Sequence, residues 1–308
     1  MSSKLKWAFM RELAAKVDNK KLFYTLLAVL GALIAVEVVA TVLIPDTRRY
    51  FYNIIEAKDS VNFMSGLLYY FSVLGIFGIC QGFKGWVGSL MALDLRTAIT
   101  KVLLKKWVTG DVSRVSLADQ RIQEDAKLCT DLTIRVFLEV VISFLIVLGL
   151  LESVWGNWPL FAASFGYAGA VILVALVFKK PLVSREISLQ ISEGHFRTAL
   201  TKIGMGQGDH TSKGHYDSIK TSYKALIATM RDYTLFNRTK GALSSLIPFL
   251  LLAPSYFAGD IKLGNLMEAV AVFDLLVINS TILVLYYADV TRSSASWERI
   301  IEFRRKLK

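Results

Sequence analysis

Residues 22–44, LFYTLLAVLGALIAVEVVATVLI, carry a single charged side chain, Glu37, within an otherwise apolar run. A helix needs roughly 20 predominantly apolar residues to cross the hydrocarbon core of a bilayer, which is about 30 Å thick. This stretch meets that length, and a helix that is apolar on all sides must be buried in lipid or in protein. Leu22–Ile44 therefore predicts a membrane span.

Five further stretches have the same character, so the sequence predicts six spans. They are Phe63–Leu93, Leu132–Trp155, Leu160–Phe178, Leu235–Phe257 and Leu266–Tyr287. The chain of 308 residues is 54% hydrophobic and has a mean hydropathy of +0.47, which is more apolar than a soluble protein of this length. We expect an all-α polytopic membrane protein in which residues 1–308 form one transmembrane domain.

The positive charges predict the orientation of the spans. Twenty-eight of the 36 Lys and Arg residues fall in four segments: 1–21, 94–131, 179–234 and 288–308. Lys and Arg are retained on the cytoplasmic side during membrane insertion. We therefore expect both termini and the extensions 94–131, 179–234 and 288–308 to be cytoplasmic. The net charge of +11 then reflects topology and contact with anionic lipid, and we expect no nucleic-acid partner.

The connectors between the predicted spans are very unequal. Those expected outside are short, at 45–62, 156–159 and 258–265, whereas the two inward connectors are long and each contains a single glycine-containing break. This pattern predicts that spans two to five continue past the membrane as long helices with short turns at their tips. Such a layout resembles the transmembrane half of an exporter-type ABC transporter.

The first 20 residues predict a helix of another kind. Leu5, Phe9 and Leu13 recur every four positions, while Lys4, Lys6 and Arg11 lie on other faces. An amphipathic basic helix of this type lies in the membrane interface. We expect residues 1–20 to form an interfacial elbow helix before the first span.

A phosphate-binding loop would be needed if this chain itself hydrolysed ATP. The segment that comes nearest to one, Gly206–Gly214, lacks the Gly-Lys-Ser/Thr ending and follows no predicted strand. The three histidines of the chain, His195, His210 and His215, show no zinc-ligand spacing either. We expect no enzyme activity, metal or cofactor in this chain. Transport would be powered either by a separate ATPase chain or without ATP.

Three short motifs resemble the SbmA/BacA family of bacterial inner-membrane peptide transporters. They are ADQRIQED at 118–125, Leu95-Arg96-Thr97, where the family has Trp in place of Leu95, and APSYFAGDIKLGNLM at 253–267. The residues that carry the resemblance are Gln120, Arg121, Glu124, Asp125, Arg96, Thr97, Pro254, Gly259 and Gly264. The family includes members with and without a fused ATPase domain.

The first and last motifs also have a physical interpretation of their own. Arg121 lies three and four residues from Glu124 and Asp125, so one helix face can carry a local ion pair or simply a solvated charged surface. Pro254 can kink the fifth span. Gly259 and Gly264 then allow a tight reversal into the sixth span.

Charged residues within a membrane span are costly and therefore mark candidate functional sites. In the family that this chain resembles, cavity carboxylates exchange protons, which implies this role for Glu139, Glu268 and Asp274, followed by Glu37 and Glu124. The alternative for Glu139 is a fixed ion pair with Arg135, four residues earlier. Glycines 78, 82, 85 and 88 predict close contact between span two and a neighbouring helix.

The resemblance implies a proton-coupled transporter that imports peptides or peptide-like antibiotics across the bacterial inner membrane. Six spans cannot easily enclose a peptide, so we expect a homodimer. Two alternatives remain at this point. The chain is the transmembrane subunit of an ABC transporter whose ATPase is a separate chain, or it is a non-transporting protein with the same fold.

Overall fold

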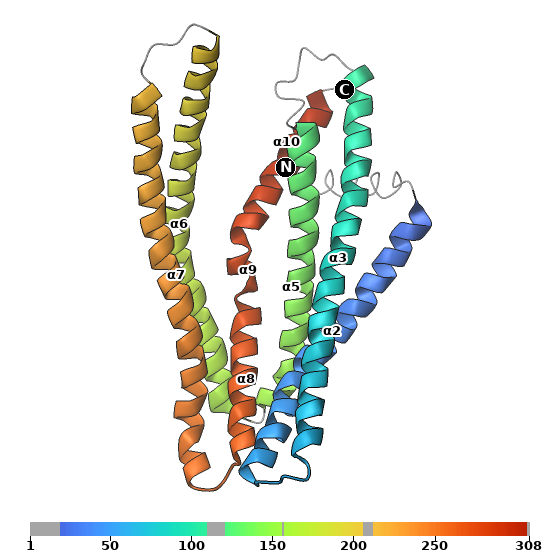
Figure 1. Ribbon diagram of the computed structural model, residues 1–308, viewed down its shortest axis with the longest axis vertical. Helices are drawn as coiled ribbons and strands as arrows, with labels where there is room; N and C mark the ends of the chain where they lie inside the picture. Colours follow the sequence, from blue (N-terminus) through green and yellow to red (C-terminus); the bar gives the residue numbers. More distant parts are fainter. Residues whose placement is uncertain (1–18, 110–120, 156, 206–211, 307–308) are drawn as a thin grey trace.

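The computed structural model describes residues 19–109, 121–155, 157–205 and 212–306. These residues form helices and short turns, and no strand occurs among them. In chain order the elements are α2 (Lys20–Glu56), α3 (Phe63–Thr109), η2 (Arg121–Asp125, a π-helical turn), α5 (Ala126–Trp155), α6 (Trp158–Gly204), α7 (Ser212–Phe257), α8 (Leu263–Ser280), α9 (Ile282–Leu285) and α10 (Tyr287–Lys306) (Figure 1). The all-α prediction is confirmed. The predicted elbow helix, the break at Gly110, Gln120 and the tip 206–211 lie outside the described residues.

Within the described residues, five helices are long and apolar enough to cross a membrane. They are α2, α3, α6, α8 and the segment Ile122–Ser153, which includes most of α5. The predicted fifth span, Leu235–Phe257, forms the second half of α7. Two prolines and several serines make it less apolar than the others. The structure therefore supports a multi-pass helical protein, while the number of six spans remains a prediction.

Three helices are far longer than a bilayer requires. The helices α3 and α6 each contain 47 residues and α7 contains 46. At about 1.5 Å per residue such a helix is roughly 70 Å long, more than twice the hydrocarbon thickness. The predicted long extensions are therefore present. They project from the end of the molecule opposite the turns 57–62 and 258–262 (Figure 1). We name the end at which the long extensions project the open end, and the end with the turns 57–62 and 258–262 the short-turn end.

The first helix corrects one expectation, that a connector starts at Pro45. Instead, α2 continues through Pro45 to Glu56. A proline inside a helix costs about 3 kcal/mol because it removes a hydrogen bond and crowds the preceding turn. The segment after it packs against neighbouring helices: Phe51 stacks on Tyr70 of α3, and Arg49 binds Glu268 of α8.

The last predicted span, Leu266–Tyr287, was expected to be continuous and is not. Helix α8 ends at Ser280, and Thr281 and Tyr286 bound the single turn of α9. The side chains of Asn279 and Thr281 donate to the carbonyl oxygens of Leu275 and Val277, at 2.7 and 2.9 Å. Polar side chains that bond nearby carbonyls in this way compete with the regular helical pattern.

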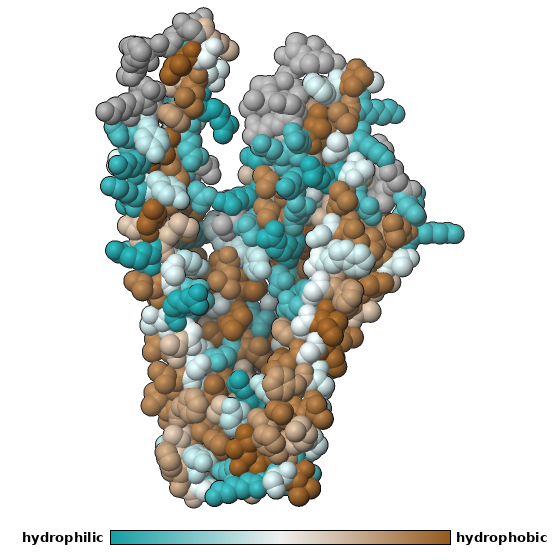
Figure 2. Space-filling view, in the orientation of Figure 1, coloured by the Kyte–Doolittle hydropathy of each residue, from teal (hydrophilic) through white to brown (hydrophobic). Residues whose placement is uncertain are grey.

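Apolar contacts divide the molecule into a compact lobe and an arm. In the lobe, α3, η2, α5 and α10 share one core near the open end, and α5, α6 and α8 share another near the short-turn end. Helices α6 and α7 pack mainly against each other and form the arm. Figure 2 shows a cleft between arm and lobe at the open end, and apolar side chains dominate the half nearer the short-turn end.

Candidate functional site

Three charged side chains from three helices meet in the lobe. Lys84 Nζ of α3 lies 2.9 Å from Glu37 Oε1 of α2 and 3.3 Å from Glu139 Oε1 of α5. The side chains of Lys84 and Glu37 are only 6% and 2% exposed, whereas that of Glu139 is 28% exposed. We name these three residues the charge cluster. One cation thus joins a deeply buried carboxylate to one that is partly open.

Close helix packing holds the charge cluster in place. Leu30 of α2, Val87 and Met91 of α3 and Leu138 of α5 form an apolar core beside it. A Cβ atom on Gly88 would lie 3.4 Å from Leu138 Cδ1, so the glycine admits α5 near α3. This agrees with the predicted close contact at Gly88. At the other three glycines of that stripe, 78, 82 and 85, an added Cβ atom would meet no atom of this chain within 4 Å, so their predicted contact with a neighbouring helix is not made within the chain.

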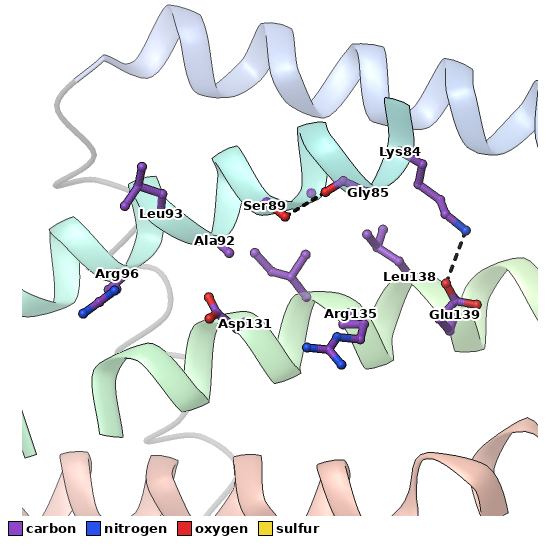
Figure 3. Close-up of a pocket in the computed structure, with 12 residues that line it drawn as sticks. Lys84, Gly85, Ser89, Ala92, Leu93, Arg96, Asp131, Arg135, Leu138 and Glu139 are labelled. Atoms are coloured by element: carbon purple, nitrogen blue, oxygen red, sulfur yellow. Dashed lines mark hydrogen bonds and ion pairs between the residues drawn. The ribbon is translucent and has the colours of Figure 1, made fainter. Parts of the chain in front are cut away.

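The exposed side of the charge cluster opens into a cavity of about 490 Å³ between α3 and α5. Figure 3 shows the residues that line it. Its charged residues are Lys84, Arg96, Asp131, Arg135 and Glu139. Arg96 belongs to the second sequence motif, and the next motif residue, Thr97, bonds the Leu93 carbonyl oxygen of its own helix. A cavity with both signs of charge can bind a ligand that carries both amine and carboxylate groups.

The structure tests one of the two interpretations of Glu139, the fixed ion pair with Arg135. Its carboxylate receives a hydrogen bond from Lys84, and the Arg135 guanidinium points away from it (Figure 3). Arg135 forms no ion pair among the residues that the structure describes. The fixed pair between Arg135 and Glu139 is therefore wrong. Sequence reasoning missed Lys84 as the partner, although a lysine in the middle of a span requires a counter-charge.

The other predicted carboxylates lie elsewhere. Asp274 of α8 accepts hydrogen bonds from Ser244 and Ser245 of α7, at 2.6 and 2.9 Å. Glu268 of α8 binds Arg49 of α2 at 3.3 Å near the short-turn end. Both therefore join neighbouring helices. Of the five predicted acids, the structure brings only Glu37 and Glu139 together.

The motif at 118–125 contributes a contact between helices. Asp125 is 4% exposed, and both of its oxygens accept hydrogen bonds from Arg299 of α10, at 2.8 and 2.9 Å to Nε. This hydrogen-bonded pairing raises the pKa of the Arg299 guanidinium. Glu124 lies beside Asp125 in η2, about 20 Å along the helix axis from Glu139. The Arg121 side chain lies outside the described residues, so its predicted pair is not tested.

The short-turn end is closed by a contact between α2 and the start of α8. The backbone N–H groups of Leu263 and Gly264 donate to Glu56 Oε2 and Asn53 Oδ1 of α2, at 2.9 and 3.0 Å. Side chains of one helix thus satisfy the unpaired N–H groups that begin another. A Cβ atom at Gly264 would lie 2.2 Å from the Arg49 carbonyl oxygen, so only glycine fits.

The preceding turn agrees in part with the prediction from the third motif. Gly259 has φ of +84°, a conformation that glycine adopts easily, and the predicted tight reversal is present. Pro254 lies inside α7, which stays one helix to Phe257.

The fold and the sequence together identify the family. Residues 13–247, more than half of the chain, match the family described as ABC transporter transmembrane region 2. The chain belongs to that family. The more specific resemblance to the SbmA/BacA family stays a prediction.

Three relatives are longer proteins with ABC transporter in their names. It is 23% identical to the inner membrane ABC transporter ATP-binding protein YddA of Escherichia coli, over 92% of this chain and 57% of that protein. It is 21% identical to the chloroplastic ABC transporter D family member 2 of Arabidopsis thaliana, over 83% of this chain and 39% of that protein. An uncharacterized ABC transporter ATP-binding protein of Synechocystis is 21% identical, over 95% of this chain and 48% of that protein. The chain thus spans about half the length of the relatives it matches.

Proposed function

We propose that this chain imports peptides or peptide-like antibiotics by alternating access coupled to protons. The observation that carries the proposal is the cavity between α3 and α5, which combines cations and carboxylates in an otherwise apolar protein. Peptides offer the matching groups, an amine, a carboxylate and amides, and charge-assisted hydrogen bonds to such groups are strong. Carboxylate groups can bind and release protons, so Glu139 and Asp131 of the cavity are the candidate proton carriers.

The size of the cavity supports the proposed homodimer. Sites of roughly 300–1,000 Å³ hold a drug-sized ligand. The cavity of about 490 Å³ is thus too small for a peptide of several residues. The arm also leaves large apolar side chains exposed, among them Ile191, Ile227 and Met230. A second copy related by a two-fold axis would enlarge the pathway and cover this surface.

We place the protein in the bacterial inner membrane, with its open end in the cytoplasm. The segments at that end contain most of the Lys and Arg residues, and such residues stay on the cytoplasmic side. Membrane lipid then contacts the apolar half of the surface in Figure 2.

Uptake into vesicles tests this function. The purified protein is reconstituted in liposomes without nucleotide, and entry of a fluorescent cationic peptide is followed while a pH gradient is applied. We expect uptake that stops when a protonophore collapses the gradient. Arg96→Ala removes one cavity cation and is expected to change uptake of a peptide with a free carboxylate more than that of its amidated form. Uptake that persists after collapse of the gradient and requires ATP contradicts proton coupling.

The relatives favour a second candidate, in which an ATPase supplies the energy. Those with 57% and 48% coverage are named as ATP-binding proteins, and this chain matches only part of each. In that case the connector tips around 110–113 and 206–214 would contact the ATPase, although most of both lies outside the described residues. Adding the ATPase and ATP to the same liposomes would start uptake without a pH gradient. No uptake under either condition would favour the non-transporting alternative.

A further inference from the structure

The charge cluster contains one more negative charge than it can pair. Two carboxylates share the single ammonium group of Lys84. Glu37 Oε2 is buried and has no hydrogen-bond partner among the described residues. An unpaired carboxylate oxygen away from water is costly, and an uncompensated charge there is more so. One additional positive charge would balance the three groups.

The geometry admits a proton from one side only. Glu139 lines the cavity and its side chain is 28% exposed, so water can deliver a proton to its carboxylate. Glu37 is 2% exposed and is separated from the cavity by Lys84, which lines the cavity. Of the two carboxylates in the charge cluster, Glu139 is therefore the one that water in the cavity can reach.

We propose that the charge cluster is a binding site for one proton, and that its occupancy controls the link between α3 and α5. Protonation forms an O–H bond on Glu139 and removes its charge, so the attraction to Lys84 is lost. Lys84 then turns fully to Glu37, whose second oxygen is available. The link between α2 and α3 is kept while that between α3 and α5 is released. This inference rests on the proposed function, because it names the site that couples proton entry to helix movement.

Other charged and titratable groups lie near the charge cluster, and the experiment must distinguish their protonation from that of Glu139. Arg96 of α3 and Asp131 and Arg135 of α5 line the same cavity, and the hydroxyl of Tyr286, between α9 and α10, interacts with the charges of Glu139, Arg135, Asp289 and Lys84. Among the described residues, only Lys84 lies within ion-pair distance of Glu139. Because the other charged groups lie beyond ion-pair distance, we predict that substituting Glu139 changes proton binding at the charge cluster more than substituting any of them does.

Infrared difference spectra between acid and alkaline pH, on the purified protein in lipid nanodiscs without peptide or nucleotide, count the protonated carboxyl groups. We expect a carbonyl band of one protonated carboxylic acid that disappears in Glu139→Gln and returns, shifted, in Glu139→Asp. The control Glu193→Gln changes an exposed acid on the arm and should leave the band unaltered. Lys84→Met removes the one cation of the charge cluster, so a second protonated acid should appear. A band that survives in Glu139→Gln overturns the proposal.

Distance measurements test the consequence for the helices. Spin labels at Ile79 of α3 and Phe144 of α5, both exposed, report the separation of these helices in a variant whose buried cysteines are replaced. We expect a longer separation at acid pH, and the same long separation at every pH in Glu139→Gln. A separation that changes neither with pH nor with Glu139→Gln contradicts the proposed release of α5 from α3. If the infrared band and the helix separation both respond as expected but no peptide is taken up, the proton site is supported and the proposed peptide substrate is contradicted.

Discussion

Gly264→Ala is the sharpest test of the contact that closes the short-turn end. The added methyl group would lie 2.2 Å from the Arg49 carbonyl oxygen and 2.3 Å from Asn53 Oδ1. The first of these atoms is backbone of α2 and cannot rotate away. Helix α8 must therefore move away from α2, and the hydrogen bonds from the N–H groups of Gly264 and Leu263 to α2 are lost with it.

The expected cost follows from these contacts. Overpacking costs about 1–3 kcal/mol, and each of the two lost hydrogen bonds contributes about 0.5–1.5 kcal/mol. The free energy of unfolding should therefore fall by about 2–6 kcal/mol. That corresponds to a Tm lower by roughly 4–24 °C, at about 2–4 °C per kcal/mol.

Thermal unfolding in nanodiscs, followed by tryptophan fluorescence, measures this change. The matched control is Gly31→Ala, on the helix that Gly264 contacts, because its Cβ atom would meet no atom within 4 Å. Alanine is the better helix former by about 1 kcal/mol, so this control should keep or slightly raise the Tm. Equal Tm values for the two variants would show that α8 does not press on α2 as described.

Two further predictions concern groups outside the membrane. Arg299→Ala leaves the buried carboxylate of Asp125 without its cation and should loosen α10, seen as faster amide exchange there. The control Arg231→Ala breaks the exposed ion pair between Arg231 and Asp232. Such pairs contribute at most about 1 kcal/mol, so amide exchange should change little. Equal changes in exchange in Arg299→Ala and Arg231→Ala would contradict this prediction. In the turn before α3, hydrogen bonds from Asn62 hold the pKa of Asp59 below its usual 3.8. Protection of the Asn62 amide should therefore persist from neutral pH down to pH 3.8 and be lost only as the pH falls further; loss already near neutral pH would refute it.

The long helices were predictable because their cause is local. Apolar runs, glycine-containing breaks and the Gly259 turn are properties of consecutive residues. The two errors in helix boundaries have another origin. The extension of α2 past Pro45 packs against α3 and α8, and α8 ends at Ser280 although the surrounding residues are apolar enough to continue it.

The site was predictable only in part. Sequence identified Glu37 and Glu139 as costly charges, yet it did not join them. Their common partner Lys84 lies 47 and 55 residues away along the chain. Which faces of α2, α3 and α5 meet depends on how the helices rotate against one another, and a helical period of 3.6 residues does not determine that. The same holds for Asp125 and Arg299, which are 174 residues apart.

The interruptions at Thr281 and Tyr286 divide residues 263–306 into three consecutive helices, α8, α9 and α10. Helix α10 is attached to the lobe through Asp125 and to the arm through an ion pair between Arg292 and Glu186. Because α9 is a single turn bounded by Thr281 and Tyr286, a rotation of α10 can be taken up at these two positions. Helix α10 can therefore tilt at the open end while the start of α8 keeps its contact with α2.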